Sequence, residues 1–357
     1  MSRISEERIE RYRALADRKL FDLKDKKLRA FFERAAAEGV DLVSNNFNTL
    51  GMFRAPHRKN LEDVDLAMIG IPLDLGVPNP RPGTRKGPEA VRYWSLDRNM
   101  SHYFTKINPF DMCSIIDWGD VEFEHVGYNL DDCLEEIYNA FKEFVSRDIV
   151  TLSVGGEHTC TYPILRALAR DGERPLALVH LDAHFDTATN FGGARISDAS
   201  LFQVATTEGL IDSEKTIQIG IRGRGAVRAD FSQESGMRVV YAEEFQSRGV
   251  DAIIEEIKSV VGNSEVYLTV DTDVLDCMCM PGTTLPEPFG LTGREVRDIV
   301  RGLRPLDIVG ADLMELSPIY DPTGMSACLA SGITFELLCL LAETRARRTG
   351  KTNLTHW

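Results

Sequence analysis

The 357-residue sequence lacks the features that mark several classes of protein. Lys and Arg number 41 against 55 Asp and Glu, a net charge of −14, so the concentrated basic surface that nucleic acid requires is missing. No apolar run approaches transmembrane length, and the first residues lack the apolar core of a signal peptide. We therefore expect a cytoplasmic protein that binds neither nucleic acid nor membrane.

Cysteine is also scarce and unevenly placed. The seven cysteines are an odd number without the spacing of a disulfide scaffold, which predicts reduced thiols. Cys277-Met278-Cys279 suggests a soft-metal site only weakly, because a single Cys-x-Cys motif is unspecific. With 43% apolar and 27% charged residues, the chain has the composition of an ordinary globular protein.

Apolar runs and amphipathic stretches alternate along most of the chain. Residues 1–60 are an exception, because charged, helix-favouring residues up to about 40 are followed by an irregular connection. Strands are expected at residues 64–71, 149–154, 176–181, 216–222, 237–242, 265–271 and 308–314, and helices at 130–146, 161–170, 250–262, 292–304 and 326–347. This alternation predicts a three-layer α/β/α domain over residues 61–357 with a mainly parallel sheet, preceded by a helical arm over residues 1–60.

Acidic and imidazole side chains follow three of the expected strands. Asp182, His184 and Asp186 come directly after one of them, and their spacing of two places them on one face of an extended backbone. Asp271 and Asp273 follow another strand in the same way. His158 follows the third, in the segment Gly-Gly-Glu-His. Because sites in α/β sheets form at the carboxyl ends of strands, we expect these six side chains to converge.

Such carboxylates could instead be helix caps or members of ion pairs. Four carboxylates gathered without cations, however, repel one another and are costly to desolvate. The pattern therefore favours two bound divalent cations, and hard oxygen donors with imidazole suit Mn²⁺, Ni²⁺ or Zn²⁺.

These segments resemble the three metal-binding signatures of the arginase/agmatinase (ureohydrolase) family. Further motifs match in the same order along the chain, and the resemblance covers roughly residues 60 to 350. The matching segments are residues 155–158, 182–186 and 271–276, supported by residues 81–88, 281–288 and 312–318. Within the family, the chain is similar to guanidine-hydrolase and metformin-hydrolase members.

The resemblance implies a role for each of the six residues. His158, Asp182, Asp186 and Asp271 would hold one cation and Asp182, His184, Asp271 and Asp273 the other, so that Asp182 and Asp271 bridge them. A hydroxide shared by the two ions would then attack the carbon of a guanidinium group. Glu315 matches the family glutamate that pairs with the guanidinium nitrogens.

Two departures from the family pattern affect the expected chemistry. Asp198 stands where the family usually has a histidine that transfers a proton to the departing amine. It could be a weakened proton shuttle, a second anionic clamp for a longer planar cation such as a biguanide, or a sign of lost activity. In addition, Glu157 replaces the usual aspartate before His158, and Cys277 replaces a usual proline, so the surroundings of the ligands differ.

We therefore predict a hydrolase of C–N bonds in linear amidines that uses two Ni²⁺ or Mn²⁺ ions. Its substrate would be a small cationic guanidino or biguanide compound, such as guanidine, a guanidino acid or metformin. Arginine is disfavoured, since residues 187–197 do not match the loop that arginases use for its amino-acid end. A trimer or hexamer is expected, and an unlike homologous subunit is possible in it. The alternative is a catalytically weak or silent partner subunit; a deacetylase-like amidohydrolase is disfavoured by the number of carboxylates.

Overall fold

The computed structural model describes residues 5–16, 29–30, 51–76, 81–98, 100–102, 104–123, 129–188, 195–223 and 230–350. The chain divides into two units, Met1–Asn46 and Phe47–Trp357. The first unit contains α1 (Glu6–Ala16), whose first turn carries Glu6 and Glu7, where acidic side chains favour the helix dipole. Most of the other residues of the expected arm lie outside the described residues.

The boundary between the units differs from the one expected at residue 60. Gly51–Arg54 belongs with the second unit, because Met52 and Phe53 are buried in its core. The Met52 amide donates a hydrogen bond of 2.8 Å to Oδ2 of Asp117. The irregular composition of this segment conceals its packing from sequence inspection, since the two buried side chains are too few to form a periodic pattern.

The second unit is built on an eight-stranded sheet within the described part of the chain, and each pairing in it is parallel. The strand order is β2-β1-β3-β8-β7-β4-β5-β6. The strands are β1 (Leu66–Ile71), β2 (Ile115–Asp120), β3 (Val150–Gly155), β4 (Leu176–Leu181), β5 (Ile211–Ile221), β6 (Arg238–Tyr241), β7 (Glu265–Asp271) and β8 (Asp307–Met314). Their apolar runs are buried on both faces, as expected of parallel strands.

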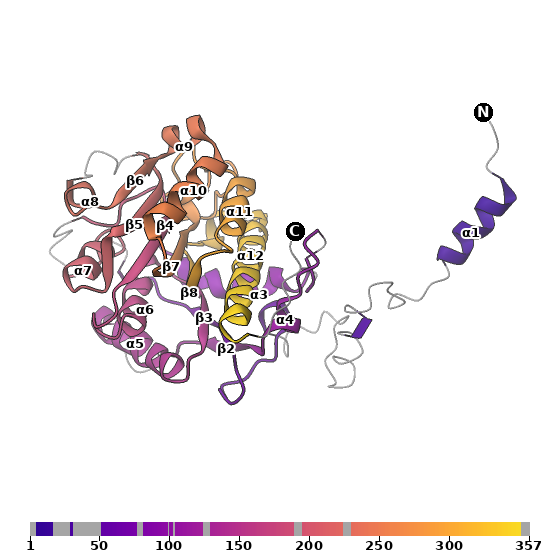
Figure 1. Cartoon of the computed structure of the whole chain (residues 1–357), viewed down its shortest axis with the longest axis horizontal. Coiled ribbons are helices and arrows are strands. Elements are labelled where there is room, and N and C mark those ends of the chain that lie inside the picture. The colour runs from indigo at the N-terminus through magenta and orange to yellow at the C-terminus, as the bar shows by residue number, and fades with distance from the viewer. Residues whose placement is uncertain are drawn as a thin grey trace. The chain divides into compact units, whose positions relative to one another are not determined.

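Helices cover both faces of the sheet, which confirms the predicted three-layer α/β/α fold (Figure 1). One face packs against α3 (Gly87–Ser95), α9 (Ala242–Arg248), α10 (Val250–Val261), α11 (Gly293–Gly302) and α12 (Met325–Arg348). The other face packs against α5 (Leu130–Ser146), α6 (Thr161–Leu168) and α7 (Leu201–Thr207). The short helices α4 (Pro109–Met112) and α8 (Asp230–Glu234) complete the unit.

Helix starts follow ordinary capping chemistry. The Asn129 side chain accepts the Asp131 amide at the start of α5, and Thr292 forms a reciprocal capping box with Glu295 at the start of α11. The helices expected at residues 130–146 and 292–304 begin within one residue of the observed ones.

Helix α12 corrects one expectation. It is long and apolar enough to cross a membrane by length and composition, although no run of that length was expected. However, 72% of its apolar window is buried inside the unit. The helix packs against β8, β3 and α3, so the core of the fold accounts for its hydrophobicity.

The central strands β3, β8, β7 and β4 are neighbours, and the residues predicted to form the site follow their carboxyl ends. Leu181 on β4 pairs with Val270 on β7, and Val270 pairs with Leu313 on β8. Asp182 and Asp271 are therefore the next residues on adjacent strands, at the same level of the sheet. The strand order, rather than the chain order, brings the three signatures together.

Candidate metal centre

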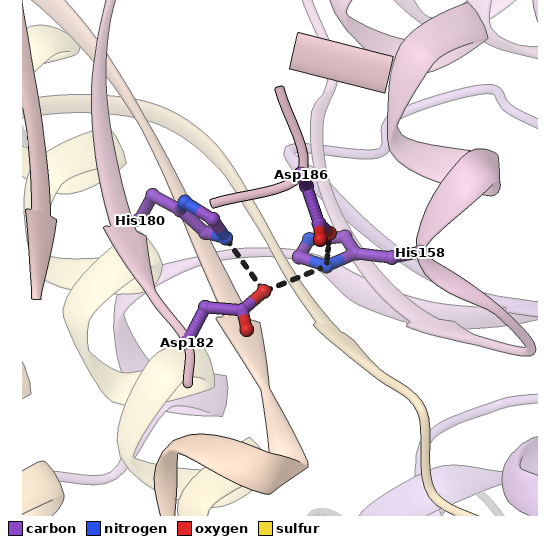
Figure 2. Close-up of side chains that lie close together, drawn as sticks. All are labelled: His158, His180, Asp182 and Asp186. Atoms are coloured by element: carbon purple, nitrogen blue, oxygen red, sulfur yellow. Dashed lines mark hydrogen bonds and ion pairs between the residues drawn. The ribbon is translucent and has the colours of Figure 1, made fainter. Parts of the chain in front are cut away.

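The six side chains predicted to bind metal converge at the carboxyl edge of the sheet. His158 lies in a short 3-10 helix, His158–Cys160, directly after β3. Its Nδ1 atom lies 3.2 Å from Oδ2 of Asp182, 3.0 Å from Oδ2 of Asp186 and 3.2 Å from Oδ2 of Asp271. Figure 2 shows Asp182 and Asp186 directed toward this imidazole. We call these four residues the His158 side of the site.

The second imidazole, His184, lies close to the remaining carboxylate, Asp273. His184 Nδ1 lies 2.9 Å from Oδ2 of Asp273 and 3.5 Å from Oδ1 of Asp182. The other oxygen of Asp273 accepts the Ala183 amide at 3.0 Å, which fixes the direction of the carboxylate. We call His184 and Asp273, together with the shared Asp182 and Asp271, the His184 side.

Asp182 faces both sides of the site. Its Oδ2 is directed to His158, whereas its Oδ1 accepts the His184 amide at 2.5 Å and lies nearest the His184 ring. Asp271 lies on the adjacent strand, with Oδ1 accepting the Asp273 amide at 2.8 Å and Oδ2 near His158. Two carboxylates in these positions fit the bridging role that the resemblance implies.

The His158 ring is prepared to bind a cation through Nδ1. Nε2 lies 2.8 Å from the Thr269 hydroxyl, which in turn donates to Oδ1 of Asp312 at 2.5 Å. Since the hydroxyl proton is used on Asp312, the Thr269 oxygen accepts from His158, and the proton of neutral imidazole resides on Nε2. Nδ1, buried and without an aligned hydrogen-bond partner among the described residues, then presents a lone pair to three carboxylate oxygens. This donor set fits a hard divalent cation.

The pKa shifts of these groups also fit a site for divalent cations. Burial, and then the neighbouring Asp182, raise the pKa of Asp186 to about 7. Burial followed by Asp273 and Asp182 raises the pKa of Asp271 well above its ordinary value. Burial alone would lower the pKa of His158, but the nearby carboxylates of Asp182, Asp186 and Asp271 raise it well above its ordinary value, because they favour a protonated ring when no cation is bound. Without cations, protons are needed to neutralise this cluster, and divalent cations would replace them.

Glu315 lies beside the His158 side, directly after β8. Its Oε1 accepts the His158 amide at 2.7 Å, and Oε2 accepts the Thr284 hydroxyl. The residue is buried and has a left-handed backbone, φ 66°, which places a strained conformation at the site. The Glu315 amide donates to the Gly156 carbonyl, and a Cβ at Gly156 would lie 1.7 Å from the Leu73 carbonyl oxygen. Gly156 is thus required for this close approach of the two backbones.

Asp198 lies in the loop before α7 and is partly buried. Its amide donates to the Gly76 carbonyl at 3.3 Å, and the Gly76 amide donates to Oε1 of Glu157 at 2.6 Å. The two positions that depart from the family pattern, Glu157 and Asp198, are therefore linked through one backbone residue. Burial raises the pKa of Asp198 to about 6, whereas the Ala199 amide and the imidazoles of His158 and His184 oppose this. Asp198 also raises the pKa of Glu315, second to burial, so the two carboxyl groups act on each other.

Comparison with known proteins decides the family. The model of the arginase family matches residues 64–339. The chain is 42% identical over 287 residues to guanidinopropionase of Pseudomonas aeruginosa, with 80% of this chain and 89% of that protein covered. It is 38% identical over 304 residues to mitochondrial agmatinase of Gallus gallus, covering 85% and 88%. This chain belongs to the arginase family.

A solved structure gives the same result for the fold. Proclavaminate amidino hydrolase from Streptomyces clavuligerus superposes with a TM-score of 0.78 at 36% identity, covering 83% of this chain and 97% of that chain. As a member of the arginase family, the chain is a hydrolase of C–N bonds in linear amidines.

Sequence inspection missed His180, which lies two residues before Asp182 on the same face of β4. His158, His180, Asp182 and Asp186 form a close group of possible metal-binding side chains (Figure 2). The Nε2 atom of His180 lies 2.7 Å from Oδ2 of Asp182. Burial lowers the pKa of His180, more than Asp182 raises it, which favours the neutral ring. Its period-two spacing was a usable signal, but its place inside an apolar run suggested a core residue.

Arg222, just after β5, was also missed. Its guanidinium donates to five carbonyl oxygens, two on the loop after β7 and two on the segment near residue 287. The acceptors are Gly220, Asp273, Leu275, Glu287 and Pro288. A buried guanidinium thus ties the Asp273 loop of this arginase-family site to its surroundings. No sequence signal indicated it, because its acceptors are backbone atoms of distant residues.

Proposed function

We propose that this chain hydrolyses a C–N bond of a small cationic guanidino or biguanide compound with two Ni²⁺ or Mn²⁺ ions held by the six converging residues. The observation that carries the proposal is the position of Glu315. Its carboxylate accepts the amide of His158, so a cation paired with Glu315 lies next to the metal ligands. Support for a guanidino substrate comes from relatives named guanidinopropionase and agmatinase.

The protein side chains bind and orient the substrate. The Glu315 carboxylate retains acceptor capacity beyond its two present hydrogen bonds, and it would hold two guanidinium nitrogens in one plane. When bound, two divalent cations supply Lewis acidity that activates water as a nucleophile at neutral pH. Glu315 would thus fix the electrophilic carbon within reach of that water and exclude other orientations.

Asp198 supplies the argument for a longer substrate. Asp198 raises the pKa of Glu315, and among the described residues neither carboxylate is paired with a Lys or Arg side chain. A biguanide has two nitrogen-rich lobes, so one lobe would pair with Glu315 and the other with Asp198. The alternative role is that of a proton donor: with its pKa raised to about 6, Asp198 in its protonated form would give a proton to the departing amine instead of pairing with a lobe.

The test is the release of ammonia, amine or urea from guanidine, guanidinobutyrate, agmatine, arginine and metformin, with Mn²⁺ and Ni²⁺ compared. We expect turnover of a guanidino compound or the biguanide and none of arginine. Glu315→Gln should lower kcat/KM at least about a hundred-fold, because the charge of the clamp is lost. An active chain whose kcat/KM is unchanged by Glu315→Gln would exclude the proposed clamp.

Exchange of Asp198 tests the biguanide part separately. Asp198→His restores the residue usual in the family and should favour simple guanidino compounds over metformin. Asp198→Asn removes the charge with almost the same shape, and should likewise lower the preference for metformin. If both variants keep the substrate ranking of the wild type, Asp198 is not a clamp.

The second candidate is a weak or silent partner subunit, which the replacement of the family histidine by Asp198 favours. Silence across the whole panel, with two cations bound per chain, would support it. The missing partner would then be sought by co-purification with a homologous chain. We also propose a cytoplasmic trimer or hexamer, which light scattering of the purified protein would test.

A further inference from the structure

We propose that His180 and Gln218 form a positioning pair that directs the Asp182 carboxylate toward both cations without binding either of them. The inference rests on the proposed two-cation site and assigns a role to residues just outside the ligand set. Both residues are fully buried on adjacent strands, β4 and β5. Their side chains are hydrogen-bonded to each other, and His180 continues the chain of bonds to Asp182.

The direction of each hydrogen bond follows from Gln218. Its Nε2 atom lies 2.7 Å from the Phe185 carbonyl oxygen, which only accepts, so this atom is the amide nitrogen and not the oxygen. The same Nε2 lies 3.0 Å from Nδ1 of His180 and uses its second proton there. Nδ1 of His180 therefore accepts, and the ring proton resides on Nε2.

This tautomer rules out His180 as a ligand. Nδ1 accepts from Gln218, and Nε2 donates to Oδ2 of Asp182 at 2.7 Å, so neither nitrogen has a free lone pair for a cation. The ring is held in place by Phe202, whose centroid lies 4.5 Å away. Like His158, His180 lies close to the Asp182 carboxylate, but the two rings differ in their roles.

The donated proton has a consequence for Asp182. Oδ2 is occupied on one side by His180 and faces His158 Nδ1 on the other, while Oδ1 accepts the His184 amide. The carboxylate is therefore held at both oxygens, with one lone pair of each left for the His158 and His184 sides. Since partners of this kind orient metal ligands, loss of the His180 proton should weaken cation binding without removing a ligand.

The test uses Mn²⁺ as the probe and the full chain, with free Mn²⁺ measured by electron paramagnetic resonance during titration. His180→Leu should weaken binding about 10- to 100-fold while the stoichiometry stays at two ions per chain. His180→Gln keeps a donor at the position of Nε2 and should restore most of the affinity. Gln218→Met, which releases the tautomer, should have an intermediate effect.

The control is Thr216→Val. Thr216 is also buried on β5, two residues from Gln218, but its hydroxyl donates to the Asp212 carbonyl and does not reach the site. Its Mn²⁺ affinity should equal that of the wild type. If His180→Leu does not fold, Gln218→Met decides the question.

Each other outcome contradicts a distinct claim. A fall to one bound ion in both His180 variants would make His180 a ligand, and unchanged affinity in His180→Leu and Gln218→Met would remove the positioning role. Equal losses in His180→Leu and His180→Gln would reduce His180 to a packing residue. Failure of the wild type itself to bind Mn²⁺ or Ni²⁺ would overturn the proposed function rather than this inference alone.

Discussion

The two sides of the metal centre are supported in different ways. The His158 side is enclosed within the sheet: its imidazole is 1% exposed and leads through Thr269 to Asp312, which also accepts hydrogen bonds from Thr161 and Tyr267. The His184 ring is 17% exposed, and its Nε2 lies 3.8 Å from Glu287, beyond hydrogen-bond length. The Asp273 loop on that side is held by Arg222.

The two sides of the site are therefore held by different kinds of contact. Hydroxyl groups of β7 and α6, together with the buried Asp312 carboxylate, support the His158 side with short hydrogen bonds, so its geometry is set by the core. Loop backbone and a longer ionic contact support the His184 side, which is the more accessible one.

The largest effect is expected at Asp182, one of the two residues that both sides share. Asp182→Ala removes one carboxylate oxygen from each side, so both cations should be lost and activity should fall more than about a thousand-fold. Metal analysis after dialysis, together with turnover, checks this. Asp251→Ala, at an exposed position in the first turn of α10, is the control. An Asp182→Ala protein that retains two cations would show that Asp182 does not bridge them.

Arg222→Leu should lower the stability of the protein and weaken cation binding on the His184 side. Five carbonyl oxygens would lose their donor, which should lower the free energy of unfolding by about 3 kcal/mol or more and weaken the binding of one cation. Urea unfolding and Mn²⁺ titration measure the two effects. Arg238→Leu, which removes ion pairs to Glu244 and Glu256 away from the site, should affect stability alone. Equal metal loss in both variants would contradict the assignment of Arg222 to this side.

The cation-free protein should lose stability as the pH rises from about 5 to 8. Burial raises the pKa of Asp186 to about 7 and that of Glu315 to about 8, so the folded state binds more protons than an unfolded chain with carboxyl pKa values near 4. Each excess proton lowers the free energy of unfolding by about 1.4 kcal/mol per pH unit in this range. The raised pKa values of His158 and His184 act in the same direction, because their pairing with carboxylates is lost as they deprotonate.

Bound cations should reverse this trend, since they replace protons at the same oxygens. The increase in Tm on addition of Mn²⁺ should therefore be larger at pH 8 than at pH 6. Asp186→Asn, which removes one raised carboxyl from the His158 side, should flatten the pH profile of the cation-free protein. A profile that is flat in the wild type would contradict the burial of uncompensated carboxylates.

The smallest effects are expected at Thr269 and Glu287, which lie beside the imidazoles of His158 and His184. Thr269→Val removes the acceptor of the His158 Nε2 proton and should weaken binding of one cation about 10- to 100-fold. Glu287→Gln weakens a 3.8 Å contact with the partly exposed His184 ring and should lower the Mn²⁺ affinity less than about ten-fold. Paired Mn²⁺ titrations decide the order. A larger effect of Glu287→Gln would reverse the comparison of the two sides.

Much of the fold could be predicted from local pattern. The apolar runs before His158, Asp182 and Asp271 correspond to β3, β4 and β7, and the parallel three-layer architecture followed from their alternation with helices. Strand β2 was missed, since Asp117 and Asp120 interrupt its apolar residues. Their ion-pair partner, Arg92, is distant in sequence. The candidate ligands were found because three apolar runs are each followed by Asp or His side chains. The extended backbone expected for these ligands is not observed throughout, since Asp273 lies in a 3-10 helix, Thr272–Val274, and Asp186 has a left-handed backbone, φ 52°.

The sequence by itself determined which residue types end each strand, and hence that hard ligands gather at one edge of a parallel sheet. Only the tertiary structure decided that β8 lies between β3 and β7, which brings Glu315 to the His158 amide. It also decided the partners of the site, from Thr269 and Asp312 to the His180–Gln218 pair and Arg222. The physical reason is that periodicity along a chain records which face of an element is buried, whereas hydrogen-bond partners depend on which elements are neighbours in space.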